Sequence, residues 1–163
     1  MAYLDTYFAR AYYGEKHQGR TASITDDKQI YLKDARHPLI DAEHVVANTY
    51  RMDDKHPILL ITGPNTGGKT VSLKIVGLFT LMAYSGIPVL ADEAIVPMFD
   101  QIFVDIGDDQ SIVQSLSTFS AHLSKLAQLT DKATANSLVL LDELGGGTDP
   151  QEGESLAIAV LEF

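Results

Sequence analysis

A glycine-rich segment between two apolar runs constrains this chain more than any other feature. It fits the pattern G-x-x-x-x-G-K-[ST] and comprises Gly63, Pro64, Asn65, Thr66, Gly67, Gly68, Lys69 and Thr70. The apolar run 58–61 precedes it and the apolar segment 71–82 follows it. The alternative is an ordinary glycine-rich turn before a core helix, but chance gives this pattern in about one chain in a hundred or fewer. The strand, turn and helix context favours a phosphate-binding loop.

The residue types in this loop suit a nucleoside triphosphate. Its glycines let the backbone curl so that the N–H groups from about Asn65 to Thr70 point at an anion, and we assign Val71 to the same site. A helix beginning at Lys69 adds the positive end of its dipole. The Lys69 ammonium would reach the β- and γ-phosphates, and the Thr70 hydroxyl would be a ligand of Mg²⁺. The expected cofactors are therefore ATP and Mg²⁺.

Composition bounds the class of protein. The 163 residues suffice for one α/β domain with a core, and 45% of them are hydrophobic. No run of 18 uncharged apolar residues is present, and the N-terminus lacks the basic and apolar regions of a signal peptide. Cysteine is absent, which excludes disulfides and thiolate metal sites and suits a reducing cytoplasm. We expect a cytoplasmic protein without a membrane partner.

The formal net charge is −10, from 12 Lys and Arg against 22 Asp and Glu. Docking on duplex DNA uses several phosphate contacts from a basic face, and this chain has few cations to gather into one. Any nucleic acid partner is therefore expected to contact another part of a larger protein.

Apolar spacing and turn residues predict the elements of the fold. We expect a helix over 1–19 that Gly14 ends, a polar turn over 21–27, and a strand entry or turn at Arg36-His37-Pro38. Ser117 is expected to cap a helix that begins at Thr118. The uninterrupted apolar run 58–61 suits a central strand covered on both faces. Other expected strands are 29–32, 45–51, 88–91, 101–106 and 137–141, and other expected helices are 69–84 and 151–163.

Two adjacent acids follow the apolar strand 137–141. An acid at the end of a buried strand beside the phosphate-loop strand can hold Mg²⁺, which assigns Asp142. Glu143 can orient and deprotonate the water that attacks the γ-phosphate, so Glu143 and Lys69 are the expected catalytic residues. Acidic pairs in turns, at 26–27, 53–54 and 108–109, are more often caps or solvated loops.

These motifs together resemble the MutS family of ATPases over essentially the whole chain. They are the loop 63–70, the segment 117–120, the segment 142–150, and Arg36-His37-Pro38 upstream. The segments 115–120 and 147–150 resemble the second bacterial branch, the MutS-two endonuclease type. The resemblance implies an α/β P-loop NTPase fold of the ABC-ATPase class, with a central, mostly parallel sheet flanked by helices, truncated at its C-terminus. It also implies that 1–20 ends a preceding helical lever or clamp and that 21–163 is a partial ATPase domain.

The resemblance further implies a dimer and a function. Ser117 and Thr118 would form the signature motif that faces the γ-phosphate bound to the other subunit, and 144–150 would be the loop that crosses the dimer interface. DNA, branched or mismatched, or ribosomal RNA would be bound through domains outside this chain. The adenine-stacking aromatic of the mismatch-recognising branch is missing near Val45, and the family's switch histidine lies beyond the segment present.

Three functions remain open from the sequence, and a fourth, a small-molecule kinase, is disfavoured because the sequence shows no arginine-rich lid. The first is the ATP-hydrolysing core of a MutS-two type protein of DNA repair or recombination control, whose parent would also be an endonuclease. The second is another ABC-class ATPase, although 115–120 does not match a Leu-Ser-Gly-Gly signature. The third is a nucleotide-binding or interaction module that does not hydrolyse ATP, and the isolated chain is expected to show little or no turnover.

Overall fold

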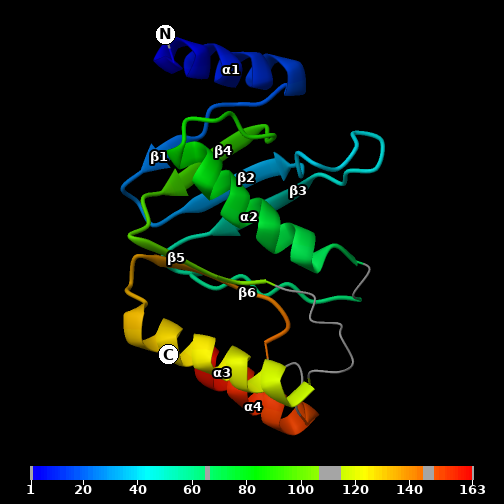
Figure 1. Ribbon diagram of the computed structural model, residues 1–163, viewed down its shortest axis with the longest axis vertical. Coiled ribbons are helices and arrows are strands. Elements are labelled where there is room, and N and C mark those ends of the chain that lie inside the picture. Colours follow the sequence, from blue (N-terminus) through cyan, green and yellow to red (C-terminus); the bar gives the residue numbers. More distant parts are fainter. Residues whose placement is uncertain (1, 65–66, 107–114, 145–148, 163) are drawn as a thin grey trace. The chain divides into compact units, whose positions relative to one another are not determined.

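A computed structural model describes residues 2–64, 67–106, 115–144 and 149–162 (Figure 1). The chain divides into two compact units, Met1–Met98 and Phe99–Phe163. A four-stranded sheet belongs to the first unit, and a two-stranded sheet belongs to the second. Each unit therefore has a sheet of its own.

The sheet of the first unit is mixed, with the strand order β1-β4-β2-β3. These strands are β1 (Ser23–Thr25), β2 (Ile30–Ala35), β3 (Asn48–Met52) and β4 (Glu93–Pro97). Strand β1 runs parallel to β4, whereas β2 runs antiparallel to both β3 and β4. Leu32 of β2 pairs with Tyr50 on one side and with Ala94 on the other, and all three are buried. Strands β2 and β4 are therefore the two inner strands of this sheet.

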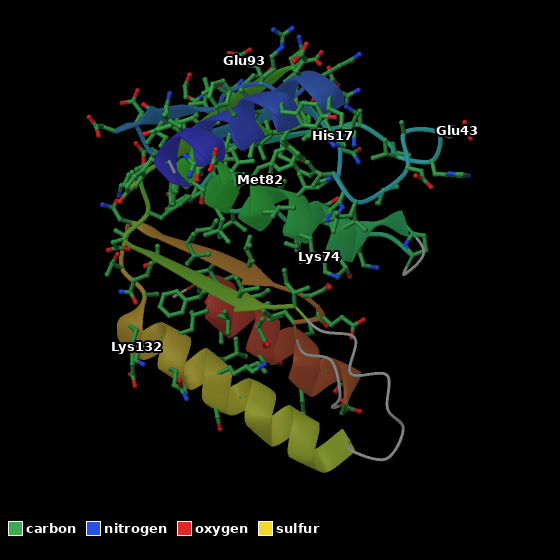
Figure 2. The ribbon with its side chains drawn as sticks, turned by 45° about the horizontal axis from the view of Figure 1, so that its top comes forward. His17, Glu43, Lys74, Met82, Glu93 and Lys132 are labelled. Atoms are coloured by element: carbon green, nitrogen blue, oxygen red, sulfur yellow. The ribbon has the colours of Figure 1, made fainter. Side chains whose placement is uncertain are left out.

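Helix α2 (Lys69–Tyr84), labelled in Figure 1, carries six buried residues. Hydrogen bonds tie its two ends to different strands. The Tyr50 hydroxyl of β3 donates to Ser72 Oγ at 3.0 Å, and the Tyr84 hydroxyl donates to the carbonyl of Pro97 in β4 at 2.6 Å. Figure 2 labels Met82, which is buried, and Lys74, which is exposed, on this helix. The buried residues of α2 are Ile75, Val76, Gly77, Phe79, Thr80 and Met82.

Helix α1 (Ala2–His17) continues through Gly14, so the prediction that Gly14 ends it is wrong. Gly14 is buried, and a Cβ built on it would lie 2.8 Å from Pro88 Cγ. Glycine is needed here because the helix backbone approaches Pro88 closely. The helix ends instead near Gln18, which takes a left-handed φ of 54°, while the Gly19 N–H donates to the Gly14 carbonyl at 2.8 Å.

The second unit is a strand–helix–strand unit followed by a further helix. Strands β5 (Gln101–Asp105) and β6 (Ser137–Leu141) pair in parallel over five residues each. Helix α3 (Ser115–Lys132) connects them, and α4 (Pro150–Leu161) follows. Leu126 and Leu129 of α3 and Leu138 and Leu140 of β6 are buried, which is the helix-on-sheet packing that a parallel crossover produces.

The predicted central, mostly parallel sheet is wrong. The larger sheet is mixed, and the parallel pair β5–β6 forms a separate sheet. Residues 58–61 form no strand, and Ile58 and Leu60 are 54% and 71% exposed. An uninterrupted apolar run indicates a tendency toward burial but does not supply a partner strand, which is why this prediction failed.

Two further predictions in the first unit are wrong. The segment 21–27, predicted as a turn, contains β1, and the segment 88–91, predicted as a strand, makes only an isolated bridge between Val89 and Arg20. The strand that follows is β4, whose buried Ala94 and Val96 alternate with half-buried Ile95. The predicted strands at 29–32, 101–106 and 137–141 and the helix 69–84 are confirmed. The strand predicted at 45–51 is confirmed from Asn48 onward, as β3, whereas residues 45–47 form no strand.

Phe79→Ala tests the core of the first unit. The Phe79 side chain has no exposed surface, whereas Leu81 on the same helix is 52% exposed. We expect Phe79→Ala to lower the free energy of unfolding by about 3–5 kcal/mol, because it removes a buried ring and leaves a cavity. The control Leu81→Ala should change it by about 0.5 kcal/mol or less. Equilibrium urea unfolding measures both, and equal losses would contradict the packing of α2.

Candidate phosphate-binding site

The glycine-rich loop forms a turn that glycine backbone conformations make possible. Gly63 has a φ of 147° and Gly68 a φ of 78°, and a Cβ at either position would have no atom within 4 Å. The Gly67 N–H donates to the Pro64 carbonyl at 2.9 Å, which closes the turn. Asn65 and Thr66, which we predict to line the site, lie outside the described residues. Gly63, Pro64 and Gly67 are exposed, and Gly68 is half-buried.

Helix α2 begins at Lys69, as the sequence predicts. Its N-cap is Gly68, which has no side chain with which to cap the helix. The Gly68 carbonyl accepts the first intrahelical hydrogen bond, from the Ser72 N–H at 2.9 Å. The first N–H groups of any α-helix point out of its N-terminus and carry the positive end of the dipole. Here that end meets the loop, an arrangement suited to binding an anion.

The Lys69 side chain turns back across the loop. Its ammonium donates to the Gly63 carbonyl at 2.6 Å, so the positive charge lies beside the first glycine of the loop. Thr70 and Val71 follow in the first turn of α2 and are half-buried. Lys69, Thr70 and Val71 thus follow one another at the start of α2, and their roles in binding phosphates and Mg²⁺ stay predictions.

A histidine near α2 is held in its neutral form. Burial, and secondarily the charge of Lys74 on α2 (labelled in Figure 2), lower the pKa of His37. Its Nδ1 accepts the Leu39 N–H at 3.3 Å, which requires an unprotonated nitrogen. His37 and Pro38 form the predicted turn, with the Ile40 N–H donating to the His37 carbonyl.

The predicted acids lie in the second unit, directly after β6. The Asp142 N–H donates to the Asp105 carbonyl at 2.9 Å, one residue past the last paired residue of β6. Asp142 Oδ1 accepts the Glu143 N–H at 3.1 Å. Glu143 is exposed and has a φ of 48°, a conformation that costs free energy for a residue other than glycine. The backbone thus turns sharply at the proposed general base.

Sequence reasoning missed Asp105, the last residue of β5. Its register partner is Leu141, so it ends its strand at the same edge as Asp142. The Asp105 side chain is 13% exposed, and its Oδ1 lies 2.7 Å from Lys125 Nζ on α3. An acid ending a strand parallel to β6 was the available signal. The ion pair joins the helix that carries Ser117 and Thr118 to the strand end beside Asp142.

Ser117 and Thr118 lie within α3, which begins at Ser115. The prediction that Ser117 caps a helix starting at Thr118 is therefore wrong. Of the predicted interface turn, residues 145–148 lie outside the described residues. Asp149 caps α4 by accepting the Gln151 N–H at 3.0 Å, with Pro150 at the first helical position. The signature roles of Ser117 and Thr118 stay predictions.

Within the described ranges, no group of three or more His, Asp or Glu side chains could hold a metal ion. In the same ranges, no helix is long and apolar enough to cross a membrane. Thr70 and Asp142, predicted to hold Mg²⁺ together, belong to the first and the second unit respectively.

A comparison with known protein families identifies the family of this chain. A family model described as MutS domain V matches residues 59–163. The chain belongs to this family. The match to MutS domain V starts just before the phosphate-binding loop and includes α2, both strands of the second sheet and Asp142.

Curated relatives carry the same segment inside longer proteins. The chain is 53% identical to a protein named Endonuclease MutS2 from Lactococcus lactis subsp. cremoris (strain SK11), over 99% of this chain and 21% of that protein. Proteins of the same name from Listeria monocytogenes and Caldanaerobacter subterraneus are 49% and 52% identical, over 98% of this chain and 20% of each. The resemblance to the MutS-two branch is confirmed, and the chain spans about a fifth of these relatives' length.

Gly68→Ala tests the turn that starts α2. Because Gly68 has a φ of 78°, alanine would be held in the left-handed region, and the free energy of unfolding should fall by about 1–2 kcal/mol. The control is Gly67→Ala, whose Cβ would meet Pro64 at an ordinary 3.6 Å. Urea unfolding should show a clearly smaller loss for the control. Equal stability of the two variants would refute the left-handed turn.

Proposed function

We propose that this MutS domain V binds ATP with Mg²⁺ and hydrolyses it. The observation that supports this most directly is the start of α2, where Gly68 turns the backbone into the helix and the Lys69 ammonium reaches back to the Gly63 carbonyl. A triphosphate bound there would replace that carbonyl as the partner of Lys69. The N–H groups of the loop and of the first turn would donate to phosphate oxygens.

The residues of this chain fit the metal and the reaction. Bound Mg²⁺ would neutralise charge on the β- and γ-phosphates. The hard oxygen ligands that this ion prefers are available in the Thr70 hydroxyl and the Asp142 carboxylate. Glu143 would accept a proton from the water that attacks the γ-phosphorus, while the bond from that phosphorus to the β–γ bridging oxygen breaks. Lys69 would stay bound to the phosphates while the proton moves to Glu143 and the phosphorus–oxygen bond breaks.

We further propose that two copies cooperate and that the domain serves DNA repair or the control of recombination. Ser117 and Thr118 at the start of α3 would face the γ-phosphate bound to the other copy. The relatives' printed name, Endonuclease MutS2, supports a DNA-processing role. DNA or ribosomal RNA would be bound by other parts of a longer, cytoplasmic protein, because this chain carries a net charge of −10.

Glu143→Gln tests the proposed hydrolysis, in a protein of the relatives' full length that contains this domain. The variant should bind ATP as the parent does, while steady-state phosphate release falls by roughly 10² to 10⁴, the range for loss of a general base. Glu154→Gln, the same change at an exposed position of α4, should leave the rate unaltered.

Lys69→Ala should instead weaken ATP binding itself, because it removes the cation that contacts the phosphates. Turnover by Glu143→Gln equal to that of the parent would remove Glu143 from its assigned role. Unimpaired binding by Lys69→Ala would remove the loop from the nucleotide site.

A further inference from the structure

A hydrogen-bonded chain of three groups links the sheet of the first unit to the last glycine of the phosphate-binding loop. The Tyr50 hydroxyl, on β3, donates to Ser72 Oγ at 3.0 Å. Ser72 Oγ donates in turn to the Gly68 carbonyl at 3.1 Å. Tyr50 is 5% exposed, so its ring is fixed by the core. The three groups connect residues separated by 22 positions in sequence.

The last group in this series of hydrogen bonds belongs to the Gly68–Lys69 peptide, and the orientation of that peptide matters for anion binding. The Gly68 carbonyl accepts from Ser72 Oγ and also from the Ser72 N–H at 2.9 Å. A peptide unit is planar and trans, so its C=O and N–H point in opposite directions. A Gly68 carbonyl held toward the helix therefore directs the Lys69 N–H out of the helix end and toward the loop.

Glycine at position 68 makes such a restraint necessary. Gly68 has a φ of 78°, and nothing within 4 Å of a built Cβ confines it. Because glycine populates many backbone conformations about equally, sterics alone do not fix the Gly68–Lys69 peptide. A serine that bonds the carbonyl four residues earlier is common in helices. The added contact from a buried tyrosine of another element fixes the serine hydroxyl as a donor to that carbonyl.

We propose that Tyr50 is a positioning residue for the phosphate site: acting through Ser72, it holds the Gly68–Lys69 peptide with the Lys69 N–H aimed at the terminal phosphates of a bound nucleoside triphosphate. The proposal rests on the proposed function for its ligand. The residues that touch the phosphate are those of the loop, and Tyr50 itself lies behind them.

The test compares Tyr50→Phe with Tyr84→Phe in the present chain. Both substitutions remove one hydroxyl that anchors α2 to the sheet, the first at the loop end of the helix and the second at the Pro97 end. Calorimetric titration with Mg·ATP should show Tyr50→Phe weakened by about three- to tenfold, the effect of one net hydrogen bond. Tyr84→Phe should bind as the parent does, even where the two variants lose equal stability.

Ser72 gives the second arm of the test. Ser72→Ala should weaken Mg·ATP binding by at least as much as Tyr50→Phe does. The double variant should bind Mg·ATP as tightly as Ser72→Ala alone, because both substitutions break the same series of hydrogen bonds. Ser72→Thr, which keeps the hydroxyl, should restore most of the affinity. Additive losses, or equal binding by Tyr50→Phe and Tyr84→Phe, would overturn the proposal.

A ligand-free measurement separates this proposal from the proposed function. The ¹⁵N order parameter of the Lys69 amide should fall in Tyr50→Phe and stay at the parent value in Tyr84→Phe. If that pattern holds but the parent does not bind Mg·ATP, the proposed function fails while the positioning of the peptide stands. If the parent binds Mg·ATP and the order parameter is unchanged in Tyr50→Phe, the positioning role fails and the function stands.

Discussion

The left-handed turn at Gly68 is the constraint on which the candidate site depends. It lets the chain leave the loop and enter α2 within one residue, so that the N-terminus of the helix, with no side-chain cap from Gly68, meets the loop. The same turn places Lys69 where its ammonium reaches the Gly63 carbonyl. The buried face of α2 and its bonds from Tyr50 and Tyr84 then fix this helix on the sheet. Local backbone geometry and core packing thus both fix the position of the N-terminus of α2.

The net negative charge of the chain makes the local geometry of the loop more important for binding an anion. The chain has 22 acidic and 12 basic residues, so its overall field disfavours the approach of a polyanion such as ATP. At physiological ionic strength the field of exposed charges is screened over about 8 Å, so contacts within the loop would decide the proposed binding of ATP. Main-chain amides, the helix dipole and Lys69 act at that short range, and the lowered pKa of His37 leaves this group neutral.

Sequence predicted the parts of the structure whose causes are local. The bounds of α2 follow from the loop motif and the apolar segment after it, and β5 and β6 follow from short strand patterns. The acids after β6 were found for the same reason. Pairing between distant segments was not predictable, which is why 58–61 was taken for a central strand and the mixed sheet was missed. Tyr50 and Asp105 escaped notice because their partners, Ser72 and Lys125, lie about twenty residues away.

We propose that the loop and the first turn of α2 form a binding site for the phosphates of ATP. Titration of the ¹⁵N-labelled chain with Mg·ATP, followed by the amide resonances of 67–71, tests it most directly. Binding at this site should produce saturable shifts concentrated in these amides, with much smaller shifts for Mg·AMP, which lacks the β- and γ-phosphates. Shifts that are absent from 67–71, or that are equal for the two nucleotides, would contradict it.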